Sequence, residues 1–245
     1  MVKKYMIACG AALLLAPMAI QAEEEGITHE TTLNLGVVWT EGNSDTLKAN
    51  ASLLYEGERE SVGSLRAGIE ANYGETKIDR ERETDTENIS AFFNARKTLS
   101  ERTYAGLFGS GLYDSIADID YRLVLGPTAG VILFTDERTE VSAEIGPAYV
   151  WEKVDDVSND YAALRIAQRL DYQISDTARL WQQVEYIPEL DDLDNYLLNS
   201  EIGVSAALTA RTSLRLVVQS RYDNTPAPDA ERHDLTVISG VSLTL

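Results

Sequence analysis

The residue types on which catalysis most often depends are scarce in this sequence. It contains two histidines, His29 and His233, and a single cysteine, Cys9. Nucleophilic catalysis needs a serine or cysteine within hydrogen-bond reach of a base that a third group orients. We find no G-x-S-x-G turn, metal-spaced histidine and cysteine set or dinucleotide-binding loop. We therefore expect no enzyme and no cofactor. The alternative is a lipid-modifying enzyme in which a loop serine lies beside His233 and Asp234.

Acidic clusters are the next candidates for chemistry, because carboxylate oxygens bind Ca²⁺ and Mg²⁺. Asp155-Asp156 and Asp191-Asp192-Leu193-Asp194 both fall in predicted loops. Their spacing does not follow an EF-hand loop, and a solvated acidic loop also explains them. We favour the solvated interpretation and predict no metal site. His29 and His233 do not change this, because we expect them at opposite strand ends, separated by about 30 Å of hydrocarbon.

A third set consists of charged side chains within otherwise apolar stretches. Where Leu65 and Ile69 occupy one face of an extended strand, Arg66 and Glu70 occupy the other, because successive side chains point to opposite faces. Such charges tune ion selectivity when they line a barrel lumen. We predict that the set lines a lumen, where it either borders an ion path or neutralises itself and fills a small barrel. Its members are Arg66, Glu70, Arg96, Arg122, Glu144, Arg165, Arg169, Glu185, Glu201, Arg215 and Arg221, and Asp171 shares their face.

The elements that must position these side chains are β-strands. Residues 33–55 contain two alternating runs around a Gly/Asn turn, a pattern typical of a β-hairpin. The following breaks delimit twelve strands, each long enough for the roughly 9–11 residues of a tilted membrane strand. We place them at 41–45, 57–62, 75–86, 99–102, 114–118, 135–139, 153–159, 173–178, 189–195, 209–211 and 223–232. The even-numbered breaks are short, and several odd-numbered ones are long and acidic, as expected for the two ends of a barrel.

Two patterns favour a lipid-facing barrel over a secreted, soluble β-sandwich. No lysine or arginine falls on the apolar face in the middle of a predicted strand, where a cation would cost about 2–4 kcal/mol in lipid. The aromatic residues gather near strand ends, as in the aromatic girdles of membrane barrels. We assign one girdle to Trp39, Tyr73, Tyr113, Tyr121, Tyr149, Trp151, Tyr161, Tyr186, Tyr196 and Tyr222, and the other to Tyr55, Tyr104, Tyr172 and Trp181.

Two local features refine this prediction. Gly126-Pro127 and Gly146-Pro147 would lie opposite each other in one hairpin. Proline cannot donate to the ladder and glycine often marks a bulge, so we predict a kink or bulge there. The last alternating run, residues 234–245, ends with the sequence, and we predict that it closes against the first strand.

The N-terminus has the pattern of a secretory signal. Lys3 and Lys4 precede an apolar run that ends near Ala22, too short and too close to the start to be preferred as a spanning helix. We predict a signal peptide at 1–22 and an outer-membrane barrel at 23–245. The formal net charge of −19 argues against a nucleic-acid partner, which would need basic surface.

The turn Gly42-Asn43-Ser44-Asp45-Thr46 and the later run Ala143-Glu144-Ile145-Gly146-Pro147-Ala148-Tyr149 resemble the YdiY-type family of salt-induced outer-membrane proteins, a domain family of unknown function. The resemblance extends from about residue 29 to 245. It implies an outer-membrane location and expression linked to salt stress, and it supplies no catalytic residues.

Together these observations predict an all-β protein, a closed antiparallel transmembrane β-barrel of about twelve strands. We expect it in the outer membrane of a Gram-negative cell after export. The expected function is non-enzymatic: a narrow, porin-like pore or a structural envelope protein linked to salt or osmotic stress. The expected partners are outer-membrane lipid and lipopolysaccharide, the outer-membrane insertion machinery and small ions.

Overall fold

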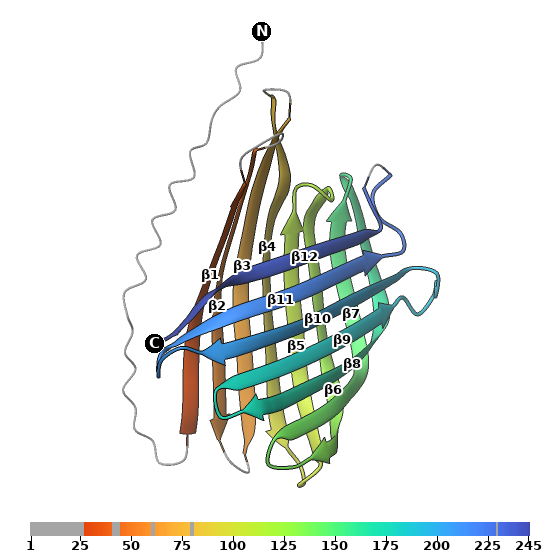
Figure 1. Cartoon of the computed structure of the whole chain (residues 1–245). Coiled ribbons are helices and arrows are strands. Elements are labelled where there is room, and N and C mark those ends of the chain that lie inside the picture. Colours follow the sequence, from red (N-terminus) through yellow and green to blue (C-terminus); the bar gives the residue numbers. More distant parts are fainter. Residues whose placement is uncertain (1–26, 41–44, 60–61, 79–80, 229) are drawn as a thin grey trace.

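The chain forms twelve antiparallel strands that close into one barrel (Figure 1). The computed structural model describes residues 27–40, 45–59, 62–78, 81–228 and 230–245. The predicted closed, twelve-stranded antiparallel barrel is therefore confirmed. The predicted signal peptide at 1–22, with Cys9, and the turn residues Gly42-Asn43-Ser44 lie outside the described residues.

The strands are β1 (Ile27–Thr40), β2 (Asp45–Arg59), β3 (Gly63–Ile78), β4 (Glu81–Thr98), β5 (Thr103–Asp114), β6 (Ile119–Thr135), β7 (Thr139–Val154), β8 (Val157–Ser175), β9 (Ala178–Pro188), β10 (Tyr196–Ala207), β11 (Thr212–Asp223) and β12 (His233–Thr244).

Each strand pairs with its neighbours in the sequence, and β12 returns to β1. Thr32 lies opposite Thr244 and Leu35 lies opposite Val241. The amide of Leu245 also donates to the carbonyl oxygen of Thr31 at 2.9 Å. The last strand thus closes against the first, as predicted. We call the end with the short turns the inner end, and the end with the loops 189–195 and 224–232 the outer end.

Polar side chains at the start of three inner turns fix the geometry of those turns. The backbone amides of Arg138 and Thr139 donate to the carboxylate of Asp136 at 2.8 and 2.7 Å, and these bonds lower the pKa of that carboxyl. Thr209 accepts the amides two and three residues ahead in the same way, and so does Ser100. Short side chains that bond the following backbone are a common way to build a tight turn.

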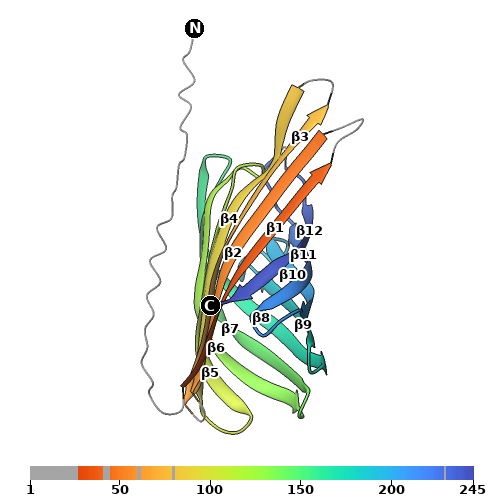
Figure 2. The same ribbon diagram turned by 60° about the vertical axis from the view of Figure 1, so that its left-hand side comes forward.

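Two of the predicted long loops are instead continuations of strands. Strands β3 and β4 run through most of 75–86, and their hairpin reaches further than its neighbours at the outer end (Figures 1 and 2). Strands β7 and β8 are joined by Asp155 and Asp156 alone, both at positive φ. Aspartate tolerates this left-handed region better than most residues, and a two-residue turn of this kind matches strand twist. The prediction is wrong here because charged residues can continue a strand beyond the apolar band as well as form a loop.

The two faces of the wall have the predicted chemistry. On β1, the apolar Leu35 is 49% exposed and its neighbour Asn34 is 5% exposed. The outward residues of the other strands are likewise apolar and exposed, including Ile69 on β3, Ile145 on β7 and Leu216 on β11. A sandwich would bury its apolar face against a second sheet, so the soluble β-sandwich is excluded. No helix in the described ranges is long and apolar enough to cross a membrane.

Three of the predicted girdle residues point inward instead. Tyr104, Tyr161 and Trp181 are buried, each on the lumen face of its strand. The reason is the same alternation that assigned the charges: Tyr161 shares a face with Arg165, and Trp181 shares one with Glu185. A position near a strand end does not determine whether a ring points outward. The face of the strand on which it lies does.

The Gly-Pro dipeptides do not create a bulge. Pairing on either side of them keeps one register, with Leu125 opposite Tyr149 and Ala129 opposite Ile145. The bulges of this hairpin lie elsewhere, between Ile119 and Tyr121 and between Ile132 and Phe134. Both prolines face outward, and a side chain at either glycine would collide with the carbonyl of the proline opposite. The glycines therefore permit close strand approach rather than a change of register.

Candidate functional site: a charged lumen

A cavity of about 810 Å³ follows the interior of the barrel. Its walls include His29 and Glu58 at the inner end and Pro226 and Arg232 in the outer loop between β11 and β12. Charged side chains from all twelve strands, together with buried apolar ones, line the space between. The cavity is thus continuous along the barrel, and side chains that cross it make it narrow.

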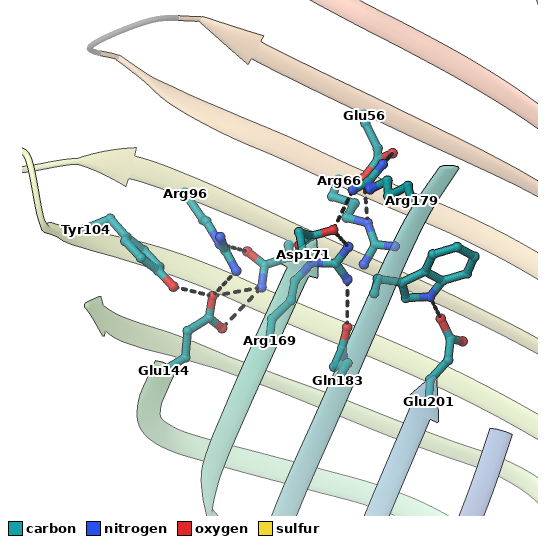
Figure 3. A network of polar contacts seen from close by, with 12 residues as sticks. Glu56, Arg66, Arg96, Tyr104, Glu144, Arg169, Asp171, Arg179, Gln183 and Glu201 are labelled. Atoms are coloured by element: carbon teal, nitrogen blue, oxygen red, sulfur yellow. Dashed lines mark hydrogen bonds and ion pairs between the residues drawn. The ribbon is translucent and has the colours of Figure 1, made fainter. Parts of the chain in front are cut away.

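The middle of the lumen contains a buried network centred on Glu144 of β7. The carboxylate of Glu144 accepts bonds from Arg165 of β8 at 2.8 Å and from Arg96 of β4 at 2.7 Å. Asn94 donates to it at 3.2 Å and the Tyr104 hydroxyl at 3.2 Å. Because β4 and β7 are not neighbours, these bonds tie distant parts of the wall together (Figure 3).

Arg165 connects Glu144 to a second carboxylate and to an aromatic ring. Its Nε donates to Glu185 of β9 at 2.5 Å, and its guanidinium lies 3.7 Å from the ring centroid of Phe108 on β5. Arg165 and Glu144 are both buried. The guanidinium therefore holds two carboxylates and covers an aromatic face at once, a geometry that suits the planar arginine side chain. We call Asn94, Arg96, Glu144, Arg165 and Glu185 the central network.

A second group lies nearer the inner end. Arg169 donates to Asp171 of its own strand at 2.5 Å, and Arg179 of β9 donates to the same carboxylate at 2.5 Å. Glu56 of β2 accepts from Arg66 at 2.9 Å and lies 4.0 Å from Arg179. Strands β2 and β9 are distant in the sheet order. This group therefore also crosses the lumen (Figure 3).

A third group lies at the outer end. Arg122 of β6 donates to Glu152 of the adjacent β7 at 2.5 Å and to Asp223 of β11 at 2.6 Å. Arg221 of β11 lies 4.0 Å from Asp114 of β5. Strand β11 is on the far side of the barrel from β5 and β6. Ion pairs therefore bridge the lumen at its outer end as well.

The three remaining predicted residues also face inward. Gln219 of β11 donates to Glu201 at 3.0 Å and to Glu70 at 3.5 Å. Glu201 also accepts the indole N–H of Trp181 at 2.6 Å, and Arg215 lies 5.2 Å from the Trp181 ring centroid. Nine of the eleven predicted residues border the cavity; Glu70 and Arg215 do not.

Sequence reasoning missed several partners of these residues. Glu56 was recognisable, because it shares the polar face of β2, but Asp114 and Asp223 had been assigned to breaks between strands. Further omissions include Asn94, Tyr104, Glu152, Arg179 and Gln219. Alternation alone assigns a face, and it carries no information about which side chains meet across the lumen.

The lumen is also less polar than its charges suggest. A cluster of buried apolar side chains projects inward from β5 to β10: Phe108, Val124, Ala148, Val150, Tyr161, Ala163, Ile187 and Leu197. Val150 lies on the same face as Glu144 and Glu152. One wall of the cavity is therefore apolar, which further reduces the space open to water.

A row of asparagines joins β2, β3 and β4 on the inner face. Asn50 donates to Asn72 at 2.7 Å, and Asn72 donates to Asn88 at 2.9 Å. We expect Asn72→Leu to lower the free energy of unfolding by about 1–3 kcal/mol, because it leaves the half-buried donor Asn50 and the buried acceptor Asn88 unpaired. Urea unfolding of liposome-reconstituted protein measures the change. Ala71→Leu on the lipid face of the same strand should have no such effect; equal losses would show that side-chain size, and not the row, matters.

The two histidines lie at opposite ends, as predicted. His29 lies near the start of β1, and the ring Nε2 of His233 lies 2.8 Å from the hydroxyl oxygen of Ser220 on β11. Within the described chain no carboxylate hydrogen-bonds to His233, so the third group of a catalytic triad is not in place. The same residues contain no group of three or more His, Cys, Asp or Glu arranged to hold a metal.

A closed antiparallel barrel with an apolar exterior and a charged interior defines the outer-membrane class of β-barrels. The family described as "Protein of unknown function, DUF481" matches residues 33–244, and the chain belongs to this family. The YdiY-type resemblance is consistent with that membership. No curated protein matches the chain significantly.

Solved structures share the fold at low sequence identity. The NanC porin is 10% identical, with 88% of this chain and 100% of that chain covered and a TM-score of 0.52. An outer membrane channel from Pseudomonas putida F1 is 8% identical, with 89% and 94% covered and a TM-score of 0.50. The KdgM porin is 8% identical, with 89% and 99% covered and a TM-score of 0.48.

Proposed function

We propose that the protein is a narrow, non-enzymatic channel of the outer membrane that passes small ions. The observation that carries the proposal is the cavity bordered by residues of both barrel ends and by charged side chains throughout. Two structures of the same fold are described as a porin and an outer membrane channel, which supports this class. The bridging ion pairs argue for ions or very small solutes rather than larger substrates.

The proposal includes a cellular context. Residues 1–22 would direct export and then be removed, insertion machinery would place the barrel in the outer membrane, and its apolar wall would contact lipid and lipopolysaccharide. The family resemblance supports a link to salt or osmotic conditions. Fractionation of cells grown at low and high salt tests both points, with heat-modifiable gel mobility as the marker of a folded barrel.

The direct test of the channel is conductance in a planar bilayer. We expect small, ohmic steps from the purified protein, since a network of charged groups lines a hydrated but constricted path. A barrel that inserts and folds but stays electrically silent would instead be a structural envelope protein. Release of fatty acid from phospholipid vesicles, abolished by Ser220→Ala, would point to the lipid-modifying alternative.

The lining charges predict the preferred ion. Twelve acidic and eight basic side chains border the cavity, an excess of four negative charges that favours cations. We expect a reversal potential of the cation-selective sign in a KCl gradient. Neutralising the outer-end residues Glu231 and Asp234 together, as glutamine and asparagine, should halve the excess and move the potential toward zero. Glu137→Gln, in an inner turn away from the cavity, should leave it unchanged. An anion-selective wild type would refute the assignment.

A further inference from the structure

The barrel wall is weakest where its two ends meet. Strand β1 pairs with β12 over four residue pairs, from Thr32–Thr244 to Leu35–Val241. By contrast, β1 pairs with β2 over fourteen pairs and β12 pairs with β11 over eleven. Beyond Leu35 the two strands diverge toward the outer end (Figure 1). We call the segments 36–38 of β1 and 235–239 of β12 the seam.

Two glycines mark the point where the strands part. A side chain at Gly36 would lie 2.8 Å from the carbonyl oxygen of Ser239, and one at Gly240 would collide with the carbonyl of Leu35. The backbones of β1 and β12 therefore come closest to each other at this point. Only glycine permits so short a distance between them. Pairing ends at this point although both strands continue.

Several side chains beyond this point are more exposed than those of fully paired strands. Val37 is 68% exposed and Leu235 is 62% exposed, whereas Ile69 and Leu214, which face outward from fully paired strands, are 52% and 50% exposed. Val38 is on the inward face of β1, yet it is 42% exposed. Ile238, the inward residue across the seam on β12, stays buried with Trp181 and Val217. The gap therefore opens on the β1 side of the wall, from the exterior to the inward face at Val38.

The seam lies within the lipid-facing apolar band. Val37 continues the outward row of Leu33 and Leu35, and Val237 continues that of Leu243 and Val241. Unpaired strand edges inside a hydrocarbon layer are tolerated only where they border protein or a water-filled cavity. Because the edges diverge, one added strand could not pair with both of them. A flexible acyl chain can fill such a wedge, and polar groups behind it can reach the exposed edges.

The lumen behind the seam offers charges of both signs. Arg221 of β11 lies opposite Asp234 of β12, and both border the cavity. Among the described residues Arg221 forms one ion pair, a long one of 4.0 Å to Asp114. A zwitterionic head group, which carries a phosphate and an ammonium, matches this pair of charges.

We propose that the β1–β12 seam is a lateral lipid-binding opening that holds a zwitterionic phospholipid, with its acyl chain between the two strands and its head group in the outer lumen. The site is independent of ion conduction, so a barrel that conducts no ions could still bind lipid, and a conducting barrel could have a closed seam.

Disulfide trapping tests the opening itself. If the ladder continued, Val38 would face Ile238, four residues beyond the paired Asn34 and Ser242 and on the same inward face. The chain after residue 22 has no native cysteine, so any disulfide in a double-cysteine variant joins the two introduced residues. We expect Asn34→Cys/Ser242→Cys to cross-link in outer membranes and Val38→Cys/Ile238→Cys to remain reduced. Equal cross-linking of both pairs would overturn the proposal.

Photolabelling tests the occupant. The protein is reconstituted into vesicles of phosphatidylethanolamine with a diazirine on the acyl chain, irradiated and analysed by mass spectrometry. Bulk lipid reaches outward Val37 in any case, but only a chain within the seam can reach inward Val38. We expect adducts at both, and none at Val217, an inward residue of the continuous wall. Labelling of Val38 at the background of Val217 would overturn the proposal, even if the seam were open.

Discussion

Replacing Arg165 with methionine should lower the free energy of unfolding by about 3–5 kcal/mol, the usual cost of removing one partner from a buried ion pair. The change removes the cation that bonds both Glu144 and Glu185. Arg96 still holds Glu144, so the larger part of the loss should come from Glu185. Urea unfolding of the barrel in liposomes, followed by tryptophan fluorescence and gel mobility, measures it.

Two controls separate charge from packing. Combining Arg165→Met with Glu144→Gln and Glu185→Gln removes the unpaired carboxylates, and most of the stability should return. Arg102→Met, in an exposed inner turn, should have no measurable effect. A loss below about 1 kcal/mol, typical of solvent-exposed pairs, would mean that water already solvates the central network. In that case the lumen would be wider than we propose, and bilayer conductance should be correspondingly large.

The wall of this barrel could be predicted from the sequence because its chemistry repeats every second residue. Leu35 and Asn34 differ so strongly in polarity that their faces follow directly from the geometry of a strand. The closure of the last strand on the first also follows, since a membrane barrel has to satisfy its backbone groups between strands.

The interior could not be predicted in the same detail. That Arg122 bonds Asp223 depends on strand tilt and register around the whole barrel, and no local pattern encodes it. The prediction for Tyr104 and Trp181 is wrong because an amphipathic ring is stable both at a lipid boundary and inside a lumen. Likewise, the charged residues of β3 and β4 extend a strand beyond the membrane layer as readily as they form a loop.

The face assignment itself makes the sharpest remaining prediction. Ile69 lies near the middle of β3, faces outward and has Leu53 and Ala91 as its cross-strand neighbours. In a bilayer, Ile69→Arg places a cation in hydrocarbon and should lower the free energy of unfolding by about 2–4 kcal/mol. Leu99→Arg, in the exposed inner turn after β4, should cost no more than about 1 kcal/mol because charges near the interface are tolerated.

The contrast between these two variants matters more than either value, because both replace an exposed aliphatic side chain with the same cation. A protein whose apolar exterior met water would treat them alike, since an exposed arginine costs little in water. Folding into liposomes across a urea series gives both free energies under one condition. Equal tolerance of the two arginines would place the Ile69 face outside the hydrocarbon layer, and the lumen assignment of Arg66 and Glu70 on the opposite face of β3 would lose its basis.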